Sequence, residues 1–236
     1  MLLFNFLTII IFSCFFADST IQDETFFFFD SFANLNNWEA FQFSSGKKPT
    51  KFKIIKENET NCLQIKSDSS ASGLISKIKF NPSEYPLLKW QWKVSNTIAN
   101  ADGKTKEGDD YPLRIFVMFE KDSSEISFWE KIEKSAIKLL SGYEPPYKSL
   151  CYVWANSIAD TSHYFSPYTD DIMIVCKQSG SEKCNLWIEE QANIAEDFQK
   201  YFKEEVPSIA CIAIMSDTDN TNSQSISYLE SIEIKN

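Results

Sequence analysis

An acidic segment followed by an arginine is the first place where this chain could do polar chemistry. The segment Glu107-Gly108-Asp109-Asp110 precedes a strand-like run in which Arg114 alternates with Phe116. Alternation puts Arg114 on the core-side face with its apolar neighbours, and an unpaired buried guanidinium is energetically expensive. We therefore expect Arg114 to pair with Asp109 or Asp110, in a ligand site or in a link between a loop and its strand.

A second acidic segment, Asp217-Thr218-Asp219-Asn220, directly follows the most apolar run of the chain. Asp217, Asp219 and Asn220 offer oxygen atoms, and Ca²⁺ accepts carboxylate and amide oxygens in flexible geometry. The segment lacks the central glycine and distal glutamate of an EF-hand loop, and Asp and Asn also form ordinary turns. The pattern therefore fits either a turn or a calcium site, and we assign no metal ligands.

Other catalytic chemistries find little support in the sequence. The chain has one histidine, His163, in a loop-like stretch, and no Gly-x-Ser-x-Gly segment for it to serve. A serine–histidine hydrolase and an HExxH zinc site are therefore not indicated. The enzymatic alternative is a glycan-acting enzyme that uses two carboxylates, such as Asp110 and Asp217, as acid and base.

A helix predicted over Glu189–Glu204 contributes further polar candidates. At about 100° per residue, Ile194, Phe198, Tyr201 and Phe202 form an apolar stripe that should dock on a sheet. Glu190, Asn193 and Asp197 fall beside this stripe rather than opposite it. Side chains at such a boundary can reach a cleft, although a solvated helix edge is the alternative.

Short strand-like runs separated by turn signals must position all of these residues. The runs are Phe26–Phe29, Phe52–Glu57, Cys62–Lys66, Gly73–Phe80, Leu87–Val94, Leu113–Phe119, Leu150–Trp154, Asp171–Cys176, Ile209–Ser216 and Ser225–Ile234. Recurrent short strands favour two packed sheets. We predict a mostly β, jelly-roll-like sandwich of two sheets with one or two peripheral helices.

Two of these runs have patterns that place them in the sandwich. In Leu87–Val94 the period of two puts Trp90 and Trp92 on one apolar face and lysines on the other, so the tryptophans should pack in the core. The run Ile209–Met215 is apolar throughout, as expected of a central strand covered on both faces. The predicted helices Ser127–Leu140 and Glu189–Glu204 are available to cover its second face.

Composition bounds the class of protein. The chain has 236 residues with 43% hydrophobic and 15% aromatic residues, enough to bury a core and to fold. Its formal charge is −10, whereas a nucleic-acid binder needs a basic patch to displace counterions. Nucleic acid is therefore not expected as a partner.

The N-terminus has the features of an export signal. Residues 1–16 carry no charged side chain, and the apolar run Phe6–Phe12 is too short to span a bilayer. Cleavage after Ala17 would release a periplasmic protein, whereas cleavage before Cys14 would give a lipid-anchored one. We expect residues 1–17 to be the signal peptide, residues 18–236 to form one domain, and the mature chain to have no transmembrane span.

Cysteines that follow the signal segment can oxidise if the protein is exported. They are Cys62, Cys151, Cys176, Cys184 and Cys211. Their odd number leaves at least one unpaired. Cys176 and Cys184 flank a turn-rich loop, and they either close it with a disulfide or remain free buried thiols.

Five segments in this order give the chain a family resemblance. They are Leu88–Val94, Glu107–Tyr111 with Arg114, Tyr152–Ala155, Glu190 with Asn193 and Asp197, and Met215–Thr221. The chain resembles, over residues 26–235, the bacterial exported family catalogued as domain of unknown function 3047. The resemblance implies a jelly-roll-like sandwich without an assigned activity, and it adds Trp92 and Trp154 to the candidate site. Ala192 stands where family members often carry arginine, which weakens any shared contact at this helix.

The leading hypothesis is an exported domain that binds a glycan or another small polar ligand. Aromatic faces would stack on sugar rings while Asp, Asn and Arg exchange hydrogen bonds with the hydroxyl groups. The alternatives are the two-carboxylate enzyme and a structural or interaction domain. Both the glycan-binding hypothesis and the enzyme hypothesis require five polar residues to converge on one region: Arg114, Asp110, Asp217, Asp219 and Glu190.

Overall fold

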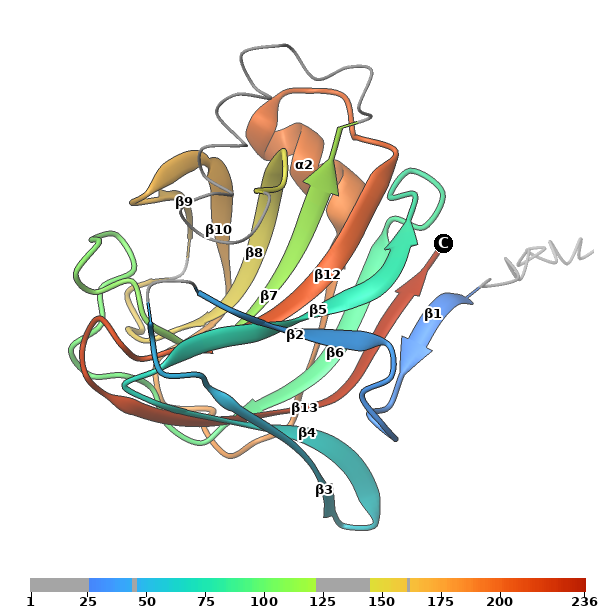
Figure 1. Ribbon diagram of the computed structural model, residues 1–236. Coiled ribbons are helices and arrows are strands. Elements are labelled where there is room, and N and C mark those ends of the chain that lie inside the picture. The colour runs from blue at the N-terminus through green and yellow to red at the C-terminus, as the bar shows by residue number, and fades with distance from the viewer. Residues whose placement is uncertain (1–25, 44–45, 122–144, 161) are drawn as a thin grey trace, which may run out of the picture.

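The computed structural model describes residues 26–43, 46–121, 145–160 and 162–236. Strands form two sheets that pack face to face as two layers (Figure 1). The prediction of a mostly β, jelly-roll-like sandwich is confirmed. The expected signal segment and the predicted helix Ser127–Leu140 lie outside the described residues.

The first sheet, called sheet A, is antiparallel and has the order β11-β6-β13-β4-β3, with β1 also paired to β13. Its strands are β1 (Phe26–Asp30), β3 (Lys51–Glu57), β4 (Thr60–Asp68), β6 (Leu87–Val94), β11 (Ile188–Asn193) and β13 (Gln224–Lys235). β13 pairs with β6 along one edge, with a register shift between Leu229 and Ser231, and with β4 and then β1 along the other.

The second sheet, called sheet B, has the order β2-β5-β12-β7-β8-β10-β9, and its β8–β10 pair is parallel. Its strands are β2 (Trp38–Gln42), β5 (Ala71–Phe80), β7 (Tyr111–Glu120), β8 (Lys148–Ala155), β9 (His163–Ser166), β10 (Thr169–Ser179) and β12 (Ile209–Asp217). Each of the ten predicted runs falls within a strand of sheet A or B. β2, β9 and β11 were not predicted, and His163 begins an edge strand rather than lying in a loop.

The core between the sheets follows the alternation of the strands. Trp90 and Trp92 of β6 are buried, as predicted. Their rings lie 5.3 Å from Tyr152 and 5.7 Å from Trp154, both on β8 of the opposite sheet. Burying large rings from both layers supplies much of the apolar contact that holds the sandwich together.

The central strand β12 is covered on both faces, as its apolar sequence predicted. It lies between β5 and β7, and seven residues in a row from Ala210 to Ser216 are buried. β12 therefore cannot be shifted by one residue without turning apolar side chains toward different surroundings.

The helix of the described part of the chain is α2 (Ile194–Phe202). It is shorter than the helix predicted over Glu189–Glu204, and it packs at a different place on the sandwich from the one expected. Residues 189–193 belong to β11, and Asn193 caps the helix, its side chain accepting a hydrogen bond from the Glu196 amide. Phe198 of α2 packs 4.5 Å from Phe119, a residue of the core between the sheets. α2 therefore closes one end of the sandwich, beyond β7 and β8 (Figure 1), and does not cover the second face of β12.

The five cysteines within the described ranges are free thiols, so Cys176 and Cys184 form no disulfide. Burial raises the pKa of the Cys176 thiol to about 11, which keeps it protonated at neutral pH. In the described parts of the chain, no helix has the length and apolar character needed to cross a membrane.

Candidate functional site

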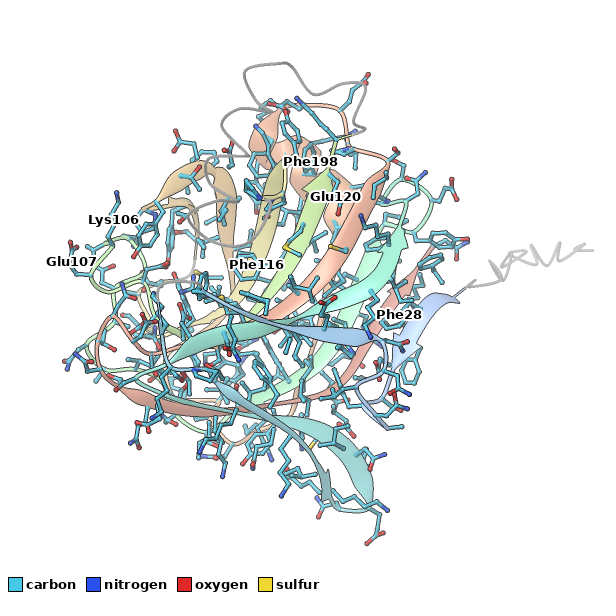
Figure 2. The ribbon with its side chains drawn as sticks, in the orientation of Figure 1. Phe28, Lys106, Glu107, Phe116, Glu120 and Phe198 are labelled. Atoms are coloured by element: carbon cyan, nitrogen blue, oxygen red, sulfur yellow. The ribbon has the colours of Figure 1, made fainter. Side chains whose placement is uncertain are left out.

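Arg114 lies at the centre of a buried cluster at one end of sheet B. It is 4% exposed, and it lies on the face of β7 opposite the core residues Leu113 and Ile115. Phe116 shares that face and stands on the front of sheet B in Figure 2. The expectation that Arg114 faces the core between the sheets is therefore wrong, although the side chain is buried as predicted.

Two carboxylates pair with Arg114. Asp109 lies just before β7 and contributes both carboxylate oxygens at 3.3 Å from Nη1. Asp217 ends β12, and it receives a bond from Nε at 2.9 Å and a second one from Nη2. The predicted pairing with Asp109 is confirmed, and Asp217 joins it because the end of β12 pairs with the start of β7.

Each of the three guanidinium nitrogens of Arg114 donates to an acceptor inside the protein. Nη2 also donates to the backbone carbonyl of Asp109 at 2.5 Å, which brings the number of hydrogen bonds made by the guanidinium to five. The Tyr111 ring covers the guanidinium, with Cζ 4.3 Å from the ring centroid. The guanidinium is therefore engaged at all three nitrogens and enclosed within the protein, because Arg114 is only 4% exposed.

Asp110 holds the turn that follows β12. Its carboxylate accepts from the backbone amides of Asn220 at 3.2 Å and Thr221 at 2.7 Å, and from the Thr221 hydroxyl at 2.6 Å. Its side chain is fully buried, and its carbonyl accepts from the Asn156 amide at 2.7 Å. Asp110 is therefore an internal anchor between two loops.

Burial dominates the electrostatics of the Arg114 cluster, by which we mean Asp109, Asp110, Arg114, Asp217 and Asp219. Burial raises the pKa of Asp217 to about 7, although Arg114 acts to lower it. Burial also raises the pKa of Asp109. Burial alone would lower the pKa of Arg114, but Asp217 and Asp109 hold it well above its usual value, so the guanidinium stays charged.

A metal ion could be held by a different set of residues from the one expected. Asp110, Asp217 and Asp219 each place one carboxylate oxygen within 4.8 Å of the others. Asn220, the third residue of the expected set, uses its side-chain nitrogen to donate to Tyr168 and to the Lys106 carbonyl. The oxygens of Asp110 and Asp217 already accept hydrogen bonds, which favours the turn over the calcium site.

The predicted aromatic candidates do not face an open surface. Trp92 and Trp154 are both fully buried in the core, and the indole N–H of Trp154 donates to the Gly180 carbonyl at 3.0 Å. A sugar ring on the protein surface has no access to either tryptophan. Their place in the candidate ligand site is therefore corrected to the sandwich core.

The remaining candidates lie apart from the Arg114 cluster. Glu190 is on β11, where it accepts from Gln178 at 2.6 Å and lies 3.8 Å from the Lys177 ammonium. Asn193 caps α2, and Asp197 accepts from the Tyr152 hydroxyl at 2.8 Å. The expected convergence holds for Arg114, Asp110, Asp217 and Asp219 and is wrong for Glu190.

An exposed tyrosine that sequence reasoning missed is linked to the Arg114 cluster through Asn220, whose backbone amide donates to Asp110. Tyr168, in the turn between β9 and β10, is 55% exposed. Its hydroxyl donates to the Lys106 carbonyl at 2.9 Å and accepts from the Asn220 side chain at 3.2 Å. We call Tyr168, Lys106 and Asn220 the Tyr168 platform. A proline followed by an aromatic residue in a turn was the available signal.

The loop that carries Lys106 packs against three tyrosines, Tyr111, Tyr164 and Tyr168. Lys106 lies with its ammonium 5.6 Å from the centroid of the Tyr168 ring, and Lys104 lies 5.4 Å from that of Tyr164. A Cβ atom on Gly103 would come within 1.7 Å of the Tyr111 hydroxyl, so that position requires glycine. Three segments distant in sequence thus meet in a defined arrangement.

Fold and site together define a two-sheet β-sandwich domain with a buried polar cluster and an exposed aromatic group at its loop end. The chain belongs to the family described as Protein of unknown function (DUF3047), whose model matches residues 36–233. No curated protein sequence matches the chain.

Two solved structures resemble the fold at low sequence identity. One is endoglucanase 3 of family GH12 from Trichoderma harzianum, with 6% identity, 90% of this chain and 97% of that chain covered, and a TM-score of 0.45. The other is the family 30 carbohydrate-binding module of the cellulosomal cellulase Cel9D-Cel44B from Clostridium thermocellum, with 10% identity, coverage of 82% and 88%, and a TM-score of 0.41. Neither likeness assigns an activity to this chain.

Proposed function

We propose that this domain binds a carbohydrate-like ligand at the Tyr168 platform. The observation that carries the proposal is the Tyr168 ring, which is 55% exposed while its hydroxyl is held by Lys106 and Asn220. A ring held at its polar end presents its face to solvent in one orientation. Such a ring loses little conformational entropy when a sugar stacks on it.

The polar groups around the ring suit a hydroxylated ligand. Asn220 uses its amide nitrogen on Tyr168 and Lys106, which leaves its carbonyl oxygen as an acceptor. The Lys106 ammonium, which lies over the ring at 5.6 Å from its centroid, supplies donors. An aromatic face bordered by a donor and an acceptor matches the apolar face and the hydroxyl groups of a pyranose.

The Arg114 cluster is connected to the platform by hydrogen bonds through the Asn220 turn. Asp110 fixes the backbone of Asn220 and Thr221, and the side chain of Asn220 in turn holds Tyr168. The enzymatic alternative is less favoured, because acid and base carboxylates must reach the substrate. Asp110 is fully buried and Asp217 is 4% exposed, so both act in the protein interior.

Export of the domain is part of this proposal. The uncharged, apolar N-terminal segment supports a signal peptide of residues 1–17, which would deliver the domain to the periplasm or, through Cys14, to a membrane surface. Intact-mass analysis of the exported protein would measure the mature N-terminus. A mature mass that still includes residues 1–13 would contradict export by cleavage.

Glycan binding is tested with the purified domain on a glycan array, followed by calorimetry on the best ligand. Tyr168→Ala should weaken binding about tenfold or more, by analogy with nucleic-acid bases, for which truncating a stacked aromatic side chain costs on the order of 1–3 kcal/mol. Phe165→Ala is the matched control, since Phe165 is a 41% exposed aromatic residue in the same hairpin. An array without binding, or equal affinity for Tyr168→Ala and the wild type, would overturn the proposal.

A further inference from the structure

We propose that the ligand of the Tyr168 platform is acidic and carries a carboxylate, as uronic-acid glycans do. The inference rests on the proposed function and names the substrate class of that same site. It depends on which of the three lysines near the platform and the Asn220 turn, Lys47, Lys104 and Lys106, already form an ion pair with a carboxylate.

Two of these lysines are already neutralised. The Lys104 ammonium lies 2.9 Å from Asp160, and the Lys47 ammonium lies 2.6 Å from Asp219. Lys106 differs, because no carboxylate in the described ranges forms an ion pair with it, and its nearest described partner is the Tyr168 ring. Lys106 is therefore a cation over an exposed aromatic ring, and no carboxylate in the described ranges balances its charge.

The hydrogen-bond inventory also points to an acceptor-rich ligand. The two hydrogens of the Asn220 amide are used within the platform, and the Tyr168 hydroxyl donates to the Lys106 carbonyl. The Lys106 ammonium is thus the strong donor left beside the ring. In a uronic acid the carboxylate is attached directly to the sugar ring, so stacking on Tyr168 brings it within reach of Lys106.

The charge around Lys106 does not attract anions from a distance, so a carboxylate would be held only by direct contact with this lysine. The chain carries a formal charge of −10, and Glu107 follows Lys106 directly. Both side chains project from the rim of the molecule in Figure 2. Long-range attraction therefore does not favour an anion, so any preference for one must depend on Lys106 itself and not on lysines in general.

The test measures binding to a panel of uronic-acid oligosaccharides, each beside its methyl ester, by calorimetry on the full mature chain. We expect at least one acid to bind more tightly than its ester. Lys106→Gln should weaken binding of that acid about threefold to fivefold, as for a partly exposed ion pair, and weaken binding of its ester less, because glutamine keeps a hydrogen-bond donor but not the charge. Lys53→Gln, at an exposed position of β3, is the matched control and should have no effect.

The outcomes separate this inference from the proposed function. Equal binding of acids and esters, with unchanged affinity in Lys106→Gln but loss in Tyr168→Ala, would overturn the acidic ligand and leave the glycan site in place. A panel on which neither acids nor neutral glycans bind would overturn both.

Discussion

At the scale of single residues, the Arg114 cluster is a closed network. All three guanidinium nitrogens of Arg114 donate to Asp109 or Asp217, and Asp110 accepts three hydrogen bonds from the turn after β12. Pairing with Asp109 could be predicted because only five positions separate it from Arg114. Asp217 lies 103 positions away, and no local pattern shows that β12 pairs with β7.

Replacing Arg114 with methionine should destabilise the domain strongly. The variant Arg114→Met leaves Asp109 and Asp217 buried without their cation, and breaking a buried pair in this way costs about 3–5 kcal/mol. Urea unfolding of wild type and variant measures the free energy of unfolding. Arg114→Lys should lie between the two, because lysine keeps the charge but not the forked geometry. A variant Arg114→Met with wild-type stability would show that the network contributes nothing to folding.

The raised pKa of Asp217 predicts how stability depends on pH. Its pKa is about 7 in the folded protein against 3.8 as the ordinary value, so between pH 4 and 7 the folded state binds more protons than the unfolded state. Stability from this group is therefore present at low pH and lost as the pH rises toward 7, by at most about 1.4 kcal/mol per pH unit. Chemical unfolding across this range measures the slope.

The control for that measurement is Asp217→Asn, which removes the titrating group and keeps an acceptor for Arg114. Its stability should fall less steeply than that of the wild type between pH 4 and 7. Parallel curves for the two proteins would mean that Asp217 titrates at its ordinary pKa, against the effect of its burial.

At the scale of elements, the segment 188–202 shows how pairing overrides a local pattern. Its apolar stripe predicted one helix over Glu189–Glu204, but residues up to Asn193 form β11 and pair with β6. Backbone pairing along an open edge of sheet A outweighs the small helix propensity of a few residues. The helix begins only after Asn193, where the side chain satisfies a free backbone amide.

The Asn193→Ala substitution should remove this cap. The side chain of Asn193 accepts from the Glu196 amide at 3.1 Å, and losing such a cap costs about 1 kcal/mol. Thermal unfolding followed by circular dichroism measures the difference. Asn193→Asp keeps a capping oxygen and should retain nearly full stability. Equal losses in both variants would indicate that Asn193 contributes through another contact.

At the scale of the whole molecule, hydroxyl groups rather than apolar contacts join the two sheets at one end. Ser67 of β4 lies 2.9 Å from the hydroxyl groups of Ser70 and Thr218, and Thr50 donates to the Ser216 carbonyl of β12 at 2.8 Å. All of these residues are buried. The network lies next to the turn that carries Asp219 and Asn220, so it helps to fix the loop end of the sandwich.

Ser67→Ala tests whether this network stabilises the fold. The substitution deprives the hydroxyl groups of Ser70 and Thr218 of a partner inside the protein, which should cost about 1–3 kcal/mol. Denaturant unfolding measures the loss. Ser181→Ala, at an exposed position after β10, serves as the control and should change stability by less than about 0.5 kcal/mol. A loss no larger than that of the control would show that the hydroxyl network around Ser67 does not stabilise the fold.

The sequence by itself determined the kind of fold and every described strand except β2, β9 and β11, because alternation and apolar runs are local properties of the chain. The burial of Trp90 and the pairing of Arg114 with Asp109 follow from the same local rules. Only the tertiary structure decided which loops meet. Asn220 lies 52 positions from Tyr168 and 114 from Lys106, and they form one platform because the strand order brings the ends of β7, β9 and β12 together. Contacts across such distances depend on how strands pair in three dimensions, which no local pattern encodes.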